Sequence, residues 1–157
     1  MAASAPLPHN VRLERRLDSS PAQVWSVLAD YPNIAGWNSG ITASYSTSDS
    51  TEGVGAQRHC DLAPMGGLDE TIREWVPEER LVISIDKASK IPIKQALMTF
   101  SLTPDGGGTS FAMNYDYEAK GGPISGLMGR MLRGRLEKGF TGFIDELAPT
   151  AAAVGRG

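Results

Sequence analysis

One glutamate has the sequence context of a buried acid or base. Glu70 lies in an otherwise apolar row with Leu68 and Ile72, at every second residue. Alternate residues of a β-strand share a face, so this spacing predicts that the Glu70 carboxylate points into the protein. Burying an unpaired carboxylate is costly, so Glu70 should be paired, hydrogen-bonded or partly protonated. In contact with a substrate, such a group can act as a general acid or base.

Arg58 is predicted to form an ion pair with Glu70 or with Glu74. A tight turn between the two strands would place Arg58 opposite Ile72, between Glu70 and Glu74. Two interpretations follow: the ion pair only neutralises the wall of a cavity, or it orients the polar end of a ligand. If the protein is an enzyme, Glu70, Arg58 and Tyr115 are the candidate catalytic residues.

The remaining reactive side chains do not form a second site in the sequence. His59 and Cys60 are neighbours in a predicted strand, so they point to opposite faces and cannot reach one substrate. No further cysteine or suitably spaced histidine completes a set of metal ligands, and His9 falls in the expected N-terminal tail. The sequence has no G-x-S-x-G motif and no phosphate-binding loop. We therefore expect no metal and no cofactor.

Seven segments have the alternation or composition of β-strands, and tight turns separate most of them. Such a series is typical of an antiparallel sheet with one buried, concave face. After the first strand, Ser20 and Gln23 form a capping box around Pro21, which predicts the start of a short helix. The strands are expected at about 11–18, 41–47, 56–62, 68–76, 81–85, 96–102 and 111–117.

The last segment, about 123–147, has the periodicity of a long helix. Its five glycines are unusual, because each interior glycine costs a helix about 1 kcal/mol relative to alanine. Either close packing against the sheet or free volume would explain them. The apolar residues predicted to share one broad arc that faces the sheet are Ile124, Leu127, Met128, Met131, Leu132, Leu136, Phe140, Phe143 and Leu147.

Composition indicates a single ordinary globular domain. The chain has 157 residues, of which 41% are hydrophobic, and a net charge of −3. This charge disfavours nucleic-acid binding and a polybasic membrane tether, and we expect no stable membrane insertion. The lone cysteine and the lack of a signal-like segment predict a cytoplasmic protein. We expect a monomer or a weak homodimer. The domain is expected at 10–148, between flexible tails at 1–9 and 149–157.

Three stretches of the chain resemble the START-like (SRPBCC) superfamily. They read SSPAQVWSVLADYPNIAGWNSGI, VGAQRHCDL and LDETIREWVPEERLVISI. That superfamily includes polyketide cyclase/dehydrase-like proteins, the birch-pollen-allergen group and the plant abscisic-acid receptors. The resemblance covers about residues 10–147. It implies an α+β helix-grip fold, in which a curved seven-stranded antiparallel sheet wraps around a long C-terminal helix, with a short helix pair after the first strand and a cavity for an apolar ligand.

The resemblance extends to a few individual positions. In the hormone receptors of the superfamily the loop after the third strand gates the cavity, and here that loop is 63–67. The stretch LDET resembles one that contains a pocket-lining glutamate, which points to Glu70. The cationic pocket residue of those receptors has no match in ITASYSTS, so the resemblance does not extend to recognition of a carboxylate hormone.

Together these observations predict an internal pocket that binds or carries a hydrophobic small molecule, such as a lipid, an isoprenoid or a polyketide. The alternative is an aromatic polyketide cyclase or dehydratase that uses the same cavity. The turn at 64–67 is expected at the mouth of the pocket. The predicted ligand-binding residues are Arg58, Leu62, Met65, Glu70, Ile83, Met98, Met113, Tyr115, Met128 and Met131.

Overall fold

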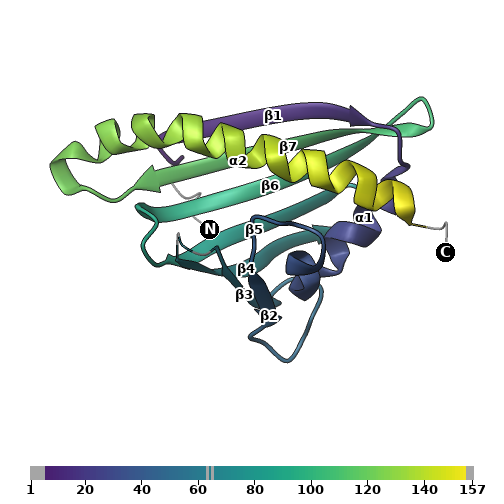
Figure 1. The fold of residues 1–157 in the computed structure, drawn as a ribbon, viewed down its shortest axis with the longest axis horizontal. Coiled ribbons are helices and arrows are strands. Elements are labelled where there is room, and N and C mark those ends of the chain that lie inside the picture. The colour runs from purple at the N-terminus through teal and green to yellow at the C-terminus, as the bar shows by residue number, and fades with distance from the viewer. Residues whose placement is uncertain (1–5, 63, 65, 155–157) are drawn as a thin grey trace.

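The protein is built on one curved antiparallel sheet and one long helix (Figure 1). The computed structural model describes residues 6–62, 64 and 66–154. The strands are ordered β1-β7-β6-β5-β4-β3-β2, so the first strand pairs with the last. The elements are β1 (His9–Leu17), α1 (Pro21–Ala29), the 3-10 helix η1 (Tyr31–Gly36), β2 (Ala43–Ser46), β3 (Gln57–Asp61), β4 (Gly67–Val76), β5 (Arg80–Ala88), β6 (Ile93–Asp105), β7 (Gly108–Ala119), the 3-10 helix η2 (Gly122–Ile124) and α2 (Ser125–Ala153).

The long helix α2 lies across one face of the sheet, along β1 and β7 (Figure 1). The short helices α1 and η1 lie at the end of the sheet that the C-terminal half of α2 approaches. An ion pair of 2.6 Å between Arg15 Nη1 and Asp145 Oδ1 links β1 to α2. This arrangement confirms the predicted helix-grip fold, including the short helix pair after the first strand.

The first helix begins where its capping residues predict. Ser20 Oγ accepts a hydrogen bond of 3.2 Å from the Gln23 N–H, and Gln23 Oε1 accepts one of 2.9 Å from the Ser20 N–H. These two bonds satisfy donors that the first turn of a helix otherwise leaves unpaired. The helix then buries Val24, Val27 and Leu28 in the core. The capping box thereby fixes the chain that leads into η1.

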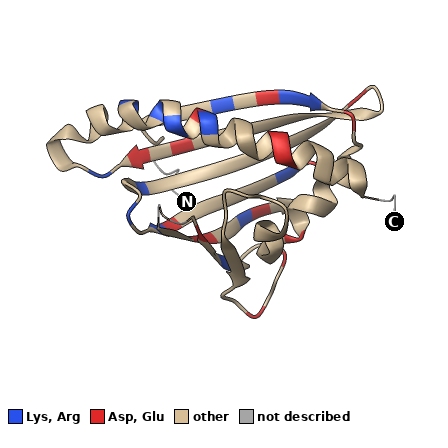
Figure 2. Ribbon diagram, viewed as in Figure 1, with Lys and Arg blue, Asp and Glu red and all other residues tan. Residues whose placement is uncertain are grey.

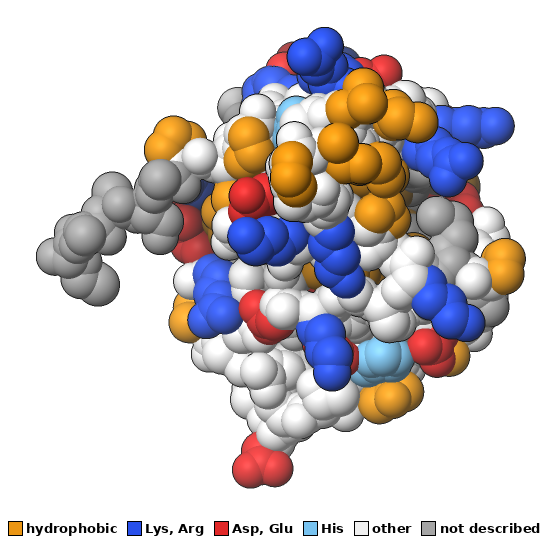
Figure 3. Space-filling model, turned by 90° about the vertical axis from the view of Figure 1, so that its left-hand side faces the viewer, with side chains coloured by type: hydrophobic (Ala, Val, Ile, Leu, Met, Phe, Trp, Pro, Cys, Tyr) orange, Lys and Arg blue, Asp and Glu red, His pale blue; other side chains and the backbone are white. Residues whose placement is uncertain are grey.

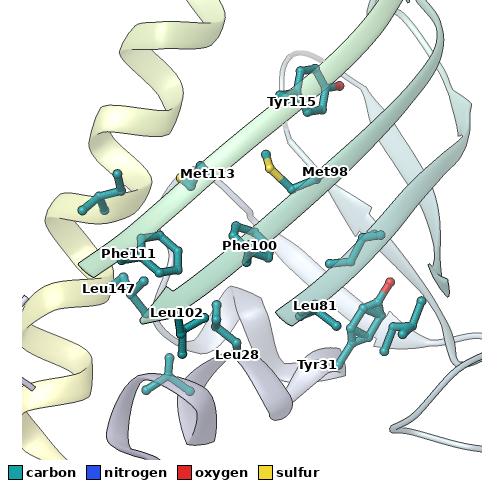
Figure 4. Close-up of a cluster of buried hydrophobic side chains, with 14 of the residues drawn as sticks. Leu28, Tyr31, Leu81, Met98, Phe100, Leu102, Phe111, Met113, Tyr115 and Leu147 are labelled. Carbon is teal, nitrogen blue, oxygen red and sulfur yellow. The ribbon is translucent and has the colours of Figure 1, made fainter. Parts of the chain in front are cut away.

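The core lies between the inner face of the sheet, α1 and the C-terminal half of α2 (Figure 4). Phe100, Phe111 and Leu147 come from β6, β7 and α2, and all three are buried. Burial of an aromatic or aliphatic side chain contributes about 1.5–3 kcal/mol to folding. In β5, β6 and β7 the residues that face this core are those buried at every second position, such as Leu81, Phe100 and Phe111.

The final helix is longer than the predicted 123–147. It begins at Ser125 and continues through Pro149 to Ala153. Ala151 is fully buried, and Gln23 Nε2 donates a 3.2 Å hydrogen bond to the carbonyl of Val154, so packing against α1 holds the last turns. Residues 149–153 therefore belong to the helix and not to the expected tail. No helix in the described part of the chain is long and apolar enough to cross a membrane.

The N-terminal end of the sheet also differs from the prediction. His9 is the first residue of β1 and stacks on Tyr117, with ring centroids 5.1 Å apart. The Tyr117 hydroxyl donates a 2.6 Å hydrogen bond to the carbonyl of Gly129 on α2. A Cβ atom at Gly129 would lie 2.1 Å from His9 Nε2, so glycine permits this close approach. The other glycines of the helix have open space at the Cβ position, namely Gly126, Gly134, Gly139 and Gly142.

The predicted apolar arc of the final helix divides into two parts. Leu132, Leu136 and Phe140 pack against the core, as expected. Ile124, Leu127 and Met131 do not: their side chains are exposed, although the sequence predicts that they face the sheet. The N-terminal half of α2 extends beyond α1, so the sheet is its neighbour on one side only. The side of the helix that faces away from the sheet is therefore exposed (Figure 1).

Candidate ligand site

A buried ion pair occupies the inner face of the sheet. Arg58 on β3 lies directly opposite Glu70 on β4, with 3.1 Å between Arg58 Nη2 and Glu70 Oε2. Both residues are buried, with 6% and 7% of their surfaces exposed. The predicted register, with Arg58 opposite Ile72, is wrong by two residues, because the turn closes early with a bond from the Leu62 N–H to the Gly66 carbonyl. A shift of two residues keeps every side chain on its face, so the predicted pairing with Glu70 survives.

A β-bulge removes Glu74 from this site. The pairing of β4 with β5 shifts between Ile72 and Glu74, which reverses the faces of the residues that follow. Glu74 then forms an ion pair of 3.4 Å with Arg80, and both side chains are about half exposed. Trp75 packs instead against Trp25, with centroids 5.0 Å apart. The expected alternation of Glu70 and Glu74 on one face is therefore wrong.

Arg58 is also fixed by η1. Its Nη1 donates a 2.7 Å hydrogen bond to the carbonyl of Tyr31, and its guanidinium carbon lies 3.9 Å from the centroid of the Tyr31 ring. Burial is the largest single effect and opposes the charge of Arg58, but Glu70, Cys60 and Tyr31 together outweigh it, so the pKa of Arg58 is raised. The guanidinium is therefore a permanent, desolvated positive charge on the inner face of the sheet.

A small cavity lies beside Arg58, between η1, the sheet and α2. Its volume is about 10 Å³, roughly the room that one water molecule requires. The side chains of Trp37, Phe100 and Phe143 stack edge-to-face and face-to-face here, with centroids 5.1 and 5.4 Å apart, and fill most of the space under α2. The lining residues are Val27, Leu28, Asp30, Ile34, Trp37, Arg58, Leu81, Ile83, Phe100 and Phe143.

Three polar atoms near this cavity lack a hydrogen-bond partner among the described residues. They are Tyr31 Oη, Trp37 Nε1 and Arg58 Nε, and all three are buried. Trp37 and Arg58 line the cavity, and the Tyr31 ring lies directly beneath the guanidinium. Trp37 Nε1 and Arg58 Nε can only donate, and burial raises the pKa of Tyr31 far above its ordinary value of 10.0, so its hydroxyl also retains a proton to donate. The cluster is therefore suited to an acceptor oxygen.

The structure places only part of the predicted pocket at this cavity. Arg58 and Ile83 line it. Glu70 does not line it but forms an ion pair with Arg58. Met98, Met113 and Tyr115 are buried on β6 and β7 but do not line it. The remaining predicted positions lie elsewhere: Leu62 and Met128 are half-buried, Met131 is 65% exposed on the outer side of α2, and Met65 lies outside the described residues.

Sequence reasoning missed the residues that complete the site. Tyr31 follows α1, where the sequence indicates only the end of a helix, and Trp37 reads as a packing residue. Phe143 reads as one member of a helical apolar stripe. In the sequence, all three are aromatic residues close to a predicted helix end or sheet contact. Such residues occur in hydrophobic cores as well as in binding sites, so the pattern does not identify a site.

Cys60 and His59 point to opposite faces of β3, as predicted. Cys60 is fully buried, and its burial, together with the nearby Glu70 carboxylate, raises the pKa of the thiol to about 12, so it is not a nucleophile. His59 lies on the outer face, where Nδ1 is 2.7 Å from Asp69 and Nε2 is 2.9 Å from Asp61. Both ring nitrogens are engaged by carboxylates, and Tyr45 packs on the ring at 5.3 Å.

A larger and more polar hollow of about 860 Å³ lies on the outer face of the sheet, next to Pro6 and Leu7. Its polar side chains bond one another. Arg73 Nε donates to Ser84 Oγ at 2.8 Å, and Ser84 Oγ donates to Asp86 Oδ1 at 2.7 Å. These polar groups are already paired with one another, whereas the inner cavity is lined by donors without a partner among the described residues, so the inner cavity is the better candidate site for an apolar ligand with an acceptor oxygen.

The comparisons with known proteins agree with this fold. The chain belongs to the polyketide cyclase/dehydrase and lipid transport family, whose profile matches residues 8–152. This confirms the predicted START-like relationship and places the chain in a family associated with hydrophobic small molecules. A search of curated proteins gives no significant match.

Several solved structures share the fold at low sequence identity. The protein TTHA0849 from Thermus thermophilus is 18% identical, with a TM-score of 0.76 over 94% of this chain and 99% of its own. Ara h 8.0201 is 10% identical, with a TM-score of 0.76 over 92% and 98%. The Zhui aromatase/cyclase from Streptomyces sp. R1128 is 16% identical, with a TM-score of 0.73 over 92% and 94%. At these identities the likeness concerns the fold alone.

Proposed function

We propose that this protein binds an apolar small molecule, a lipid, isoprenoid or polyketide, between the inner face of the sheet and α2. The observation that carries the proposal is the group of buried donors on Tyr31, Trp37 and Arg58, which have no partner among the described residues. An unpaired buried donor costs about 1–3 kcal/mol, so such a group is retained most readily where a ligand supplies the acceptor.

The chemistry of the site defines the class of ligand. Apart from Arg58 and Asp30 the walls are aliphatic and aromatic, which favours an apolar body. The buried polar atoms without a partner among the described residues are donors, which favours a carbonyl or other acceptor oxygen on that body. Glu70 already pairs with Arg58, so the site is close to neutral as a whole and does not require a carboxylate. A keto-substituted ring or chain has both properties.

A ligand of this size requires the cavity to open. The present volume holds about one water, and the nearest movable walls are Trp37 and Phe143, because both are half-buried aromatic side chains at the edge of the core. Phe143 belongs to α2, so its movement couples ligand entry to the helix. The family and the donor cluster support binding, while the closed cavity describes the protein before that movement.

A cyclase or dehydratase is the second candidate, and the Tyr31 hydroxyl favours it. Burial keeps this hydroxyl protonated, and the Tyr31 ring lies against the guanidinium of Arg58, which can polarise a carbonyl. Burial likewise raises the pKa of Tyr115, the phenol nominated from the sequence, although it does not line the cavity. Glu70 would then be the base for proton abstraction.

The test compares 2-acetylnaphthalene with 2-ethylnaphthalene, which has the same shape and no acceptor oxygen. We expect the wild-type protein to bind the ketone about tenfold more tightly, the value of one charge-assisted hydrogen bond. Calorimetry or fluorescence titration measures the ratio. Equal affinities for the two compounds would contradict the proposed binding site.

The variant Glu70→Gln separates the three roles of the carboxylate. If Glu70 orients a ligand through Arg58, most of the tenfold ketone preference is lost, a decrease of up to about 1.4 kcal/mol. If it is an acid or base, product formation from a polyketide substrate falls by about a hundredfold while binding is retained. If only the melting temperature falls, both functional roles are excluded. Glu74→Gln is the matched control, because Glu74 lies on the same strand in an exposed pair with Arg80.

A further inference from the structure

The N-terminal half of α2 presents an apolar surface that the protein itself does not cover. Ile124, Leu127 and Met131 are 57%, 57% and 65% exposed, and they are among the few large hydrophobic side chains exposed in the described residues. Leu127 and Met131 are four residues apart, so they lie on one face of the helix, opposite the face that packs on the sheet. We define Ile124, Leu127 and Met131 as the apolar tip.

Basic residues continue the same stripe along the helix. Arg135 and Lys138 follow Met131 on its outer face, and Arg130 lies beside it; all three are exposed. No carboxylate forms an ion pair with any of the three within the described residues. The sequence from 119 to 136 contains four basic residues and no acidic residue, although the whole chain has a net charge of −3.

The loop between β5 and β6 brings further lysines to this end of the molecule. Lys120 Nζ donates a 3.0 Å hydrogen bond to the carbonyl of Ala88, which places the residues before η2 beside the end of β5, where Lys87 is exposed, and beside the loop that contains exposed Lys90. Figure 2 shows Lys and Arg on both segments. Figure 3, which faces this end, shows hydrophobic side chains with Lys and Arg around them.

We propose that this end of the molecule docks on an anionic lipid surface, with the apolar tip in the acyl-chain boundary and the basic residues at the headgroups. A helix with a bulky apolar stripe and flanking Lys and Arg residues binds membranes in this way, and each basic residue near the surface adds to the attraction. The contact is peripheral, in agreement with the absence of a membrane-spanning helix among the described residues.

Charge and size argue against a second copy of this chain. A two-fold contact through the apolar tip would bring the Arg130 and Arg135 side chains of two molecules together, and like charges disfavour that contact. Three apolar side chains also bury far less than the roughly 1,200 Å² of a stable protein interface. An acidic protein satisfies the charges, but a convex helix with flexible Met and Leu side chains suits a fluid surface better than a rigid one.

Sedimentation with vesicles tests the proposal. We expect the protein to bind vesicles of phosphatidylcholine with phosphatidylglycerol at low salt, and to bind pure phosphatidylcholine weakly. Replacing both Arg130 and Arg135 with Gln should weaken binding about 25-fold, since each charge near an anionic surface contributes about a fivefold effect. The control replaces Arg16 and Arg80 with Gln, because both are about half exposed and lie away from the apolar tip, Arg16 beside Asp105 and Arg80 at the start of β5.

The double substitution Leu127→Asp with Met131→Asp should reduce binding on the order of tenfold or more, because it removes the inserted apolar groups. Val54→Asp is the matched control, since Val54 is 68% exposed on the β2–β3 loop. The absence of vesicle binding, equal binding to both lipid mixtures, or binding unaffected by the Leu127 and Met131 changes would overturn the proposal. Binding to polyglutamate but not to vesicles would assign the surface to an acidic protein instead. The vesicle assay uses no ligand of the inner cavity. The ratio of the affinities for 2-acetylnaphthalene and 2-ethylnaphthalene, measured for each variant, shows separately whether the proposed binding site is intact.

Discussion

At the residue scale, the site depends on one buried charge pair and its incomplete hydrogen bonding. Arg58 uses Nη1 for Tyr31 and Nη2 for Glu70, which leaves Nε free of partners among the described residues. A desolvated donor gains more from an acceptor than a solvated one, because the surroundings supply no competing water. The Arg58 side chain is therefore both a structural cross-link and the strongest donor available to a ligand.

Trp37→Phe tests whether the unpaired donors bind a ligand. The change removes an N–H that has no partner among the described residues, so the melting temperature should change little: the loss of packing offsets the relief of a buried donor that costs about 1–3 kcal/mol. The tenfold preference for 2-acetylnaphthalene should decrease. Trp75→Phe is the control, because Trp75 lies outside the cavity. An unchanged preference in Trp37→Phe would exclude its indole from ligand recognition.

At the element scale, α2 combines a fixed contact with loosely packed turns. Gly129 is required because His9 occupies the place of its Cβ, whereas Gly134 and Gly139 face open space. Interior glycines in a helix have a conformational cost that no packing offsets at the latter two positions. The open positions leave the middle of the helix easier to distort, which is consistent with the movement that ligand entry requires.

Alanine substitutions at these glycines should have opposite effects. Gly134→Ala and Gly139→Ala should each raise the free energy of unfolding by about 0.4–1 kcal/mol, because alanine reduces the freedom of the unfolded chain. Gly129→Ala should lower it, because its Cβ displaces the His9 ring from Tyr117. Urea denaturation measures all three. Stabilisation by Gly129→Ala would contradict the close approach of α2 to β1.

The β2–β3–β4 end of the sheet should show a pH-dependent stability. Hydrogen bonds that the His59 ring donates to the carboxylates of Asp69 and Asp61 raise the pKa of His59 above its ordinary value of 6.5, and the facing group from β2 is Tyr45. A raised pKa in the folded state means that the stabilisation is complete below pH 6.5 and is lost as the pH rises through the folded value. Melting curves of the wild type and His59→Gln should therefore differ most at acidic pH and converge at alkaline pH. A difference in melting temperature that stays constant with pH would contradict stabilisation by the contacts of protonated His59 with Asp61 and Asp69.

At the scale of the whole molecule, the sheet and α2 form two walls whose separation decides how much space is enclosed. Aromatic side chains from η1, β6 and α2 fill that space, so the enclosed volume is about 10 Å³. In such close packing, a change in the size of a single side chain changes the enclosed volume. The proposed ligand site and the core thus share the same aromatic side chains.

Phe143→Ala should enlarge the cavity directly. The change should lower the free energy of unfolding by no more than about 3–5 kcal/mol, because Phe143 is only half-buried, and should create room for a small aromatic molecule. Naphthalene should then raise the melting temperature of the variant more than that of the wild type. Phe140→Ala is the control, because Phe140 packs on Tyr115 and does not line the cavity. An equal response of both variants would place the expandable volume elsewhere.

The sequence by itself determined the strands, the first helix and the inward direction of Glu70, and it placed Arg58 within reach of Glu70 or Glu74. These features depend on periodicity and capping, which are local properties of the chain. A register error of two residues did not alter them, since side-chain direction repeats every two residues.

Only the tertiary structure decided which apolar residues surround space and which face solvent. Met131 and Phe143 belong to the same helical arc in sequence, yet one is exposed and the other lines the cavity, because the neighbours of α2 change along its length. A single bulge likewise moved Glu74 out of the site. The size of the cavity is set by how side chains from η1, β6 and α2 meet, and the packing of distant segments is not encoded in the periodicity of any one of them.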